Sequence, residues 1–212
     1  MRIRDIMTTK VITIPSNTNV AKAEDIMSTH NVSRLPVVDK GKLVGIVSRK
    51  RIMKTTAPES APIAIWRLPH FFFGMKVKEI MIRDVVTVTP DMTVEGAALI
   101  AQSKKVGATP VVEGDRLVGI VSSNDYYNKI LNPLLGIGQK RQRLVIKKPI
   151  GAKSIQEVFG CIAKHNAKVI AASYINMERK GIETDLAISL DTKDATQIVA
   201  DLRDLGYDVE VR

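Results

Sequence analysis

Apolar residues follow one pattern that occurs twice in the first 131 positions, with corresponding residues 74 positions apart. Short apolar runs at 11–14 and 85–88, each followed closely by a proline, predict strands. Apolar positions three and seven residues apart then predict a helix, and two further runs joined by a tight polar turn predict a β-hairpin. The helix positions are Val20, Ala23 and Met27 in the first copy and Val94, Ala97 and Ala101 in the second; the hairpin runs are 35–38 with 43–47, and 110–112 with 117–121. A second helix is expected after Ser48 and after Ser122, which makes each copy a β-α-β-β-α unit.

A unit of this size is too small to close its own core, so the two copies, 1–55 and 76–131, are expected to pack face to face. Clefts between two like units are natural ligand sites. The intervening connector, 56–75, carries the only tryptophan and three of the four phenylalanines of the chain. These aromatics could cover the repeat pair or form a subunit contact, and both interpretations stay open.

The pattern changes after residue 131. Asn132 and Pro133, followed by Gly136, are expected to break the helix, and 132–143 reads as a basic linker. From 144 to 212 the order is a strand, a helix opened by a capping box at Ser154, two alternating strands, a helix ending at Gly206, and a final strand. This βαββαβ order is the ferredoxin-like plan, so the predicted fold class is α+β, a repeat pair followed by a ferredoxin-like domain.

Composition narrows the class of protein. The net charge of +10 and a pI near 9.7 indicate an anionic partner, whether a nucleotide, a nucleic acid or an acidic protein. The single cysteine, Cys161, excludes a disulfide within the chain and favours a reducing, cytoplasmic location. No stretch resembles a signal peptide or is apolar for long enough to span a membrane.

The repeated block resembles a tandem pair of CBS domains, a module that senses small molecules. The resemblance rests on Ile6-Met7 with Ile80-Met81, on 34–39, on Gly45-Ile-Val-Ser48, and on 119–125, which recur in the same order. The part from about residue 144 is similar to an ACT-type domain, and the combination is similar to CBS–ACT proteins grouped with acetoin-utilisation regulators. The resemblance implies a homodimeric regulatory protein that binds an adenine nucleotide in a cleft of the CBS pair. We expect it to be non-catalytic, to have no further cofactor, and to transmit occupancy to a partner protein or to the ACT-like domain.

The resemblance also implies a nucleotide site. The family's Gly-x-x-Ser/Thr-x-x-Asp run is complete at Gly119, Ser122 and Asp125, and its aspartate accepts hydrogen bonds from both ribose hydroxyls, a task that suits an acceptor-only carboxylate. Arg51 takes the place of the aspartate in the first repeat. The basic residue expected to hold the phosphate is Arg34 in the first repeat.

In the second repeat, Ala108 replaces that basic residue. Asp125, Ser122 and Arg34 should therefore share one competent cleft, while the losses at Arg51 and Ala108 fall in the other. Thr87 could face the ribose or pack in the sheet, and Pro110 opens the strand beside Ala108; both are counted among the nucleotide-binding candidates. Taken alone, Asp125 is also a natural helix N-cap.

Enzymatic chemistry has no support in the sequence. The histidines, His30, His70 and His165, fall in different elements without metal-ligand spacing, and no hydrolase or phosphate-loop motif is present. Cys161 lies near an apolar helix face and reads as a buried thiol. An alternative function is a nucleic-acid-binding regulator that uses its basic surface, with the CBS pair tuning it; a scaffold with empty pockets is a third. The sequence leaves open which adenosine compound is bound, whether the ACT-like domain has a ligand, and which target is regulated.

Overall fold

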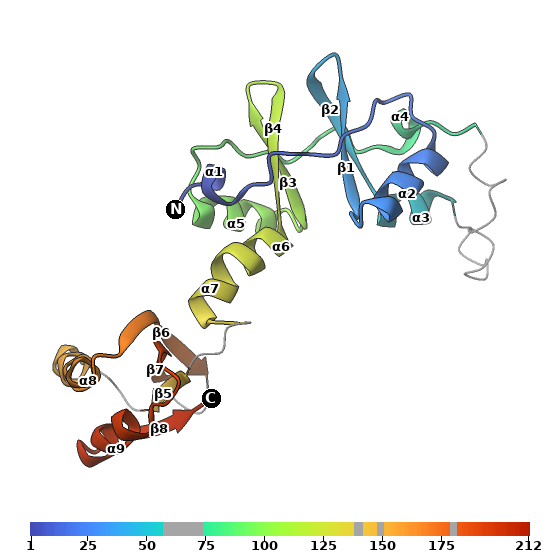
Figure 1. Ribbon diagram of the computed structural model, residues 1–212. Helices are drawn as coiled ribbons and strands as arrows, with labels where there is room; N and C mark the ends of the chain where they lie inside the picture. The colour runs from blue at the N-terminus through green and yellow to red at the C-terminus, as the bar shows by residue number, and fades with distance from the viewer. Residues whose placement is uncertain (57–73, 138–141, 148–150, 179–181) are drawn as a thin grey trace. The chain divides into compact units, whose positions relative to one another are not determined.

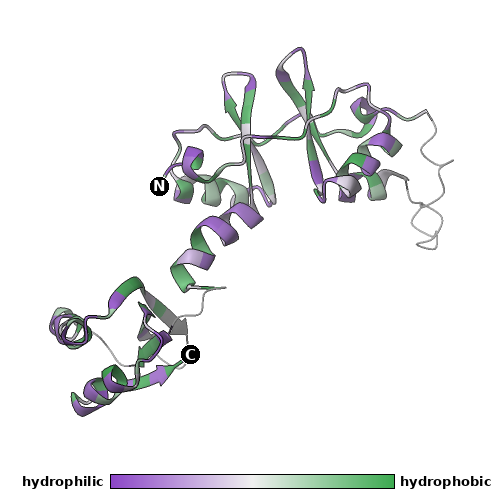
Figure 2. Ribbon diagram, in the orientation of Figure 1, coloured by the Kyte–Doolittle hydropathy of each residue, from purple (hydrophilic) through white to green (hydrophobic). Residues whose placement is uncertain are grey.

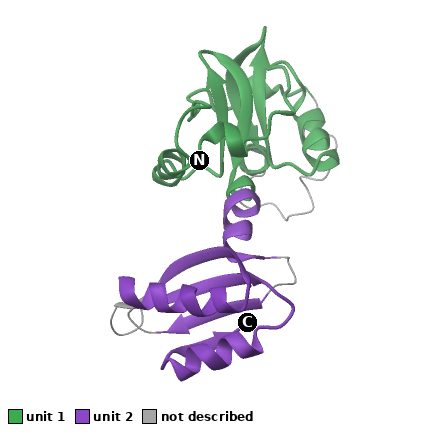
Figure 3. Cartoon of the chain, turned by 60° about the vertical axis from the view of Figure 1, so that its left-hand side comes forward, with its two compact units in different colours: residues 1–126 green, residues 127–212 purple. Residues whose placement is uncertain are grey.

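The computed structural model describes residues 1–56, 74–137, 142–147, 151–178 and 182–212. The chain divides into two compact units, Met1–Tyr126 and Tyr127–Arg212, hereafter unit 1 and unit 2 (Figure 3). The expected aromatic connector at 56–75 lies almost entirely outside the described residues. No described helix is long and apolar enough to cross a membrane.

Unit 1 contains the two repeats, and their elements correspond one to one (Figure 1). The first repeat consists of α1 (Ile3–Ile6), α2 (Val20–Thr29), β1 (Arg34–Asp39), β2 (Lys42–Ser48) and α3 (Arg49–Thr56). The second consists of α4 (Val77–Ile80), α5 (Val94–Ser103), β3 (Ala108–Glu113), β4 (Arg116–Ser122) and α6 (Ser123–Tyr126). The strands form one sheet in the order β1-β2-β4-β3, in which the two hairpins meet only where Lys42 pairs with Arg116.

The first helix of each repeat packs on the other repeat. The backbone amides of Ile3 and Arg4 donate to the carbonyls of Met92 and Pro90, at 2.9 and 3.0 Å. Conversely, α4 packs into the first repeat, and its buried Val77 belongs to the hydrophobic core around α2 and β1. The two repeats are therefore interlocked rather than merely adjacent.

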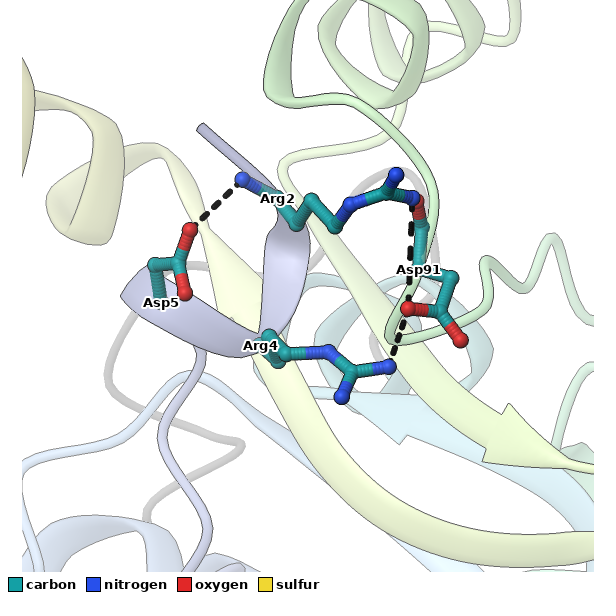
Figure 4. Close-up of polar contacts among 4 residues, drawn as sticks. All are labelled: Arg2, Arg4, Asp5 and Asp91. Atoms are coloured by element: carbon teal, nitrogen blue, oxygen red, sulfur yellow. Dashed lines mark hydrogen bonds and ion pairs between the residues drawn. The ribbon is translucent and has the colours of Figure 1, made fainter.

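On the surface, charged side chains also connect the exchanged helix α1 to the second repeat. Arg2 and Arg4 of the first repeat both contact Asp91 of the second, and the backbone N–H of Arg2 donates to Asp5 at 2.8 Å (Figure 4). Asp91 is two-thirds exposed, so these ion pairs contribute at most about 1 kcal/mol each. Burial of Ile3 and Ile6 contributes more to holding the segment.

The glycines of the two Gly-Ile-Val-Ser runs make this exchange possible. A methyl group on Gly45 would lie 2.6 Å from the Sδ of Met81, and one on Gly119 would lie 2.6 Å from the Sδ of Met7. The methionine that follows each exchanged helix thus packs directly on the partner hairpin. Only glycine leaves room for it.

The predicted strands at 11–14 and 85–88 are wrong as regular strands. Each segment is extended but makes a single bridge to its own hairpin, at Ile14 with Val37 and at Val88 with Val111. The reason lies in the exchange, because the same chain first pairs Thr8 with Ile120 of the other repeat. A segment that changes partner within six residues cannot form a continuous ladder.

Unit 2 contains η3 (Tyr127–Leu131), α7 (Asn132–Leu135), β5 (Gln142–Lys147), α8 (Ala152–Lys164), β6 (Lys168–Glu178), β7 (Ile182–Asp191), α9 (Thr196–Asp204) and β8 (Asp208–Val211). Its four strands form one antiparallel sheet in the order β6-β7-β5-β8. Both α8 and α9 carry hydrophobic and hydrophilic residues (Figure 2), and their apolar sides join the strands in one core that includes Leu144, Ile162, Ile188 and Leu202.

Two predicted helix boundaries in this region are wrong. Pro133 does not break the helix, because it lies in the first turn of α7, where its missing N–H is not needed; the helix ends instead at Gly136, whose φ is 66°. Helix α8 begins at Ala152 with Gly151 as its N-cap, so Ser154 lies inside the first turn and opens no capping box. The expected glycine stop at Gly206 is present, with φ at 87°.

Candidate functional site

Unit 1 contains a cavity of about 430 Å³ between its two repeats. Both repeats line it, through the extended segment after α1, the starts of β1 and β3, and the turn from β4 into α6. The residues with polar or charged side chains on it include Thr8, Lys10, Arg34, Ser122, Asn124 and Asp125. The cavity therefore brings cationic groups and a carboxylate to one space.

Asp125 is held at the cavity by the start of α6. One carboxylate oxygen, Oδ2, accepts hydrogen bonds from the backbone N–H and the hydroxyl of Ser122, at 2.8 and 2.7 Å. The other, Oδ1, accepts from the hydroxyl of Thr8, at 3.2 Å, which comes from the other repeat. Asp125 is not the helix N-cap, because Ser122 holds that position and Asp125 is the third helical residue reaching back to it. The carboxylate is thus fixed in orientation on a wall of the cavity, and an ionised carboxylate acts only as an acceptor.

Arg34 begins β1 and extends its guanidinium across the start of β3. The Nη1 group donates to the hydroxyl of Ser33, at 3.2 Å, and the guanidinium lies directly over Gly107. A planar cation with several donors suits phosphate and carboxylate oxygens. Lys10 adds a second cation on the same cavity, and the sequence analysis did not identify this residue. The sequence did contain a signal, because the corresponding position of the second repeat is the acidic Asp84, so the two copies differ in charge there.

The remaining predicted site residues divide between this cavity and the sheet. Ala108, expected in the other cleft, lines the same cavity as Arg34, because the starts of β1 and β3 meet there. Thr87 and Pro110 are not among the residues lining it. Pro110 is buried within β3, and its carbonyl accepts from the backbone N–H of Val88, at 3.1 Å, so it belongs to the strand support.

The counterpart of Asp125 in the first repeat is bound to the protein itself. The Nε of Arg51 donates to the carbonyl of Ile80, at 3.0 Å, in the exchanged helix α4. Its backbone N–H donates to the hydroxyl of Ser48, at 3.2 Å, so the serine keeps its capping role while the carboxylate is lost. Arg51 therefore fastens the exchanged segment and offers no acceptor for a diol.

Comparison with protein families identifies the two repeats. The model of the CBS domain matches residues 3–57 and 77–132, the two repeats. Among curated proteins, the CBS domain-containing protein YhcV of Bacillus subtilis (strain 168) is 30% identical over 123 residues, which are 58% of this chain and 81% of that protein. L-aspartate semialdehyde sulfurtransferase of Methanocaldococcus jannaschii is 34% identical over 125 residues, 58% of this chain but only 22% of the enzyme.

Solved structures agree with this match. The CBS domain pair of protein MJ0100, in complex with 5′-methylthioadenosine and S-adenosyl-L-methionine, has a TM-score of 0.52 and 31% identity, and the match covers 62% of this chain and 97% of that one. A putative acetoin utilization protein (AcuB) from Vibrio cholerae has a TM-score of 0.52 and 28% identity, and the match covers 62% of this chain and 91% of that one.

Proposed function

The chain belongs to the CBS-domain family, and on that basis we propose that it is a non-catalytic regulatory protein that binds an adenine nucleotide in the cavity of unit 1. The single observation that carries the proposal is that Asp125 and Arg34, which come from different repeats, line one cavity. A carboxylate that can accept from the ribose hydroxyls and a guanidinium that can donate to the phosphate then lie on the same cavity, as binding of a nucleoside monophosphate requires.

Each group has a defined part in the proposed complex. Asp125, together with Ser122, accepts the cis-diol of the ribose, because its carboxylate lines the cavity and is held in place by Ser122 and Thr8. Arg34 holds the phosphate, assisted by Lys10. The volume of about 430 Å³ lies within the roughly 300–1,000 Å³ range of small-molecule sites. The adenosine ligands in the CBS pair of MJ0100 support the adenosine class.

Unit 2 is part of the same proposal. Its order β5-α8-β6-β7-α9-β8 and its sheet order β6-β7-β5-β8 agree with a ferredoxin-like, ACT-like domain. We infer that occupancy of the cavity is transmitted to this domain or to a regulated protein, in a homodimer of the cytoplasm. Leu99, whose apolar side chain is 66% exposed on α5, is the position at which we test this dimer.

Calorimetric titration with AMP and with adenosine tests the site. Asp125→Ala should lower the affinity for both ligands by at least about ten- to a few hundred-fold, since the loss of even one hydrogen bond to a charged group costs roughly 1.5–3 kcal/mol. Arg34→Ala should weaken AMP and leave adenosine nearly unchanged. Arg51→Ala is the matched control, because this arginine is bonded to Ile80, and it should change neither affinity. Equal losses of both ligands in Arg34→Ala, or tight AMP binding in Asp125→Ala, would overturn the assignment.

A further inference from the structure

Three side chains with metal-binding atoms meet where α8 and α9 of unit 2 pack against each other. Cys161 lies in the last turns of α8, His165 is the C-cap residue of the same helix four positions later, and Asp201 comes from the neighbouring α9. The Sγ, imidazole nitrogen and carboxylate oxygen all lie within 4.8 Å of one another. Among the described residues this is the one group of three or more such side chains that could hold a metal ion. We propose that Cys161, His165 and Asp201 bind a zinc ion or a similar borderline-soft divalent cation.

The distances fit such an ion after small side-chain movements. Zinc binds thiolate sulfur at about 2.3 Å and nitrogen or oxygen at about 2.0–2.2 Å, so two ligand atoms of a tetrahedral site lie roughly 3.4–3.6 Å apart. The Nε2 of His165 and the Oδ2 of Asp201 are now 2.8 Å apart, in a hydrogen bond, and would have to separate slightly. The other two pairs lie within 4.8 Å and would have to close by at most about 1 Å.

The surroundings provide both a rigid base and an entrance. Cys161 is 3% exposed and belongs to the core of unit 2, which fixes the sulfur. The side chains of His165 and Asp201 are 23% and 36% exposed, so an ion can reach them from solvent. The second oxygen of Asp201, Oδ1, accepts from the amide of Gln197, at 3.0 Å, and this is the kind of outer contact that orients a metal-binding carboxylate.

The donor set selects the kind of ion. One thiolate, one imidazole and one carboxylate suit zinc or cobalt(II) and are poor partners for magnesium or calcium, which prefer oxygen ligands alone. On binding, the thiol proton leaves for solvent and a sulfur–metal bond forms. The proton on Nε2 of His165 that bridges to Asp201 is also lost, and the neutral ring keeps its one proton on Nδ1, so that Nε2 and the carboxylate each form a bond to the ion. Three protein ligands leave a fourth position for water.

The proposal is tested on the untagged full-length protein with zinc and with cobalt(II) as a spectroscopic probe. We expect one zinc ion per unit 2, competition between zinc and a chelating dye, and a cobalt spectrum with a thiolate charge-transfer band and the intense visible bands of tetrahedral coordination. Magnesium should not compete. Cys161→Ser should remove the charge-transfer band, and Asp201→Asn, at a partly exposed position that leaves the core intact, should lower zinc affinity.

Control variants distinguish a specific zinc site from adventitious zinc binding. Gln197→Ala should lower zinc affinity by about 10- to 100-fold, as loss of an outer partner does, and the two ligand variants should lower it by more. His30→Gln removes an exposed histidine of unit 1 and should change nothing. Zinc affinity or a cobalt band that is unchanged by both Cys161→Ser and Asp201→Asn would overturn the proposal, as would the absence of stoichiometric binding.

Discussion

A methyl group on Gly107 would lie 2.8 Å from a guanidinium nitrogen of Arg34. The two residues come from different repeats, and Gly107 is the counterpart of Ser33, as Ala108 is the counterpart of Arg34. The small residues of the second repeat thus leave the space that the arginine of the first repeat fills. The guanidinium of Arg34 can therefore lie at this cavity because the two repeats differ in sequence at these positions.

Gly107→Ala should therefore act through Arg34. The contact is with the end of a flexible side chain, so the protein should fold and the guanidinium should move aside. We expect AMP affinity to fall by about tenfold, in line with roughly 1.5 kcal/mol for a weakened charged hydrogen bond, while adenosine affinity stays unchanged. Calorimetry measures both, and Gly160→Ala, where no atom lies within 4 Å, is the control. An equal loss for adenosine would mean that Gly107 shapes the cavity without acting on Arg34.

Gly119→Ala should destabilise unit 1 by about 1–3 kcal/mol, the usual cost of overpacking, because the new methyl would meet the Sδ of Met7 at 2.6 Å. Met7→Ala in the same chain should recover part of this loss, since the sulfur is gone but the carbonyl of Thr8 remains at 3.2 Å. Urea unfolding of the two single variants and the double variant gives the coupling. Strictly additive losses would contradict the direct contact.

Asp39 should make stability depend on pH. Its carboxylate accepts from the backbone N–H of Ser16, at 2.9 Å, and the hydrogen bonds from the side chain and backbone of Ser16 hold the pKa of Asp39 below its ordinary value. A lowered folded-state pKa contributes stability that is present above the unfolded pKa and is lost as the pH falls through the folded pKa. The difference in unfolding free energy between the parent and Asp39→Asn should therefore be present at pH 7 and shrink below about pH 4. A difference that does not change with pH would exclude this role.

Leu99→Glu should shift the proposed dimer toward monomer, because it adds a charge at an apolar side chain that is 66% exposed on α5. Gln102→Glu adds the same charge to the same helix at another exposed position and serves as the control. Light scattering across tens of micromolar measures the mass. A monomeric parent protein would refute the dimer itself.

Residues 127–212 should fold alone, since the core of unit 2 is formed by its own strands and helices. The isolated fragment should show a cooperative thermal transition by circular dichroism, and the same fragment with Leu202→Ala should melt several degrees lower because it loses a fully buried side chain. A fragment without a transition would show that the unit depends on unit 1.

The tandem CBS pair was predictable from the sequence and is confirmed. Periodicity identified the helices around Val20 and Val94, because burial of one helix face imposes the spacing directly. The exchange of α1 and α4 could not be read in the same way. Ile3 and Val77 are apolar whichever copy they cover, so the pattern does not say which core they enter.

For the polar residues, too, the sequence does not tell which side chains come together in space. The motif around Asp125 indicated a site, but the presence of Lys10 and Ala108 on one cavity depends on how the segment after α1 and the start of β3 come together. Cys161 and His165 have the four-residue spacing of a helix face, a signal that was available in the sequence. Asp201 joins them only through the packing of α8 against α9, to which spacing along the chain gives no guide.

Because α1 and α4 are exchanged, neither repeat has a complete core without the other. A protein with only one repeat would keep its hairpin and α2 but would lack the residues corresponding to Val77 and Ile80, which fill the first repeat's core. Such a protein could complete its core only by trading N-terminal segments with a second molecule. In this chain the exchange takes place within one molecule, so a sequence boundary drawn between the two repeats passes through the middle of both structural halves.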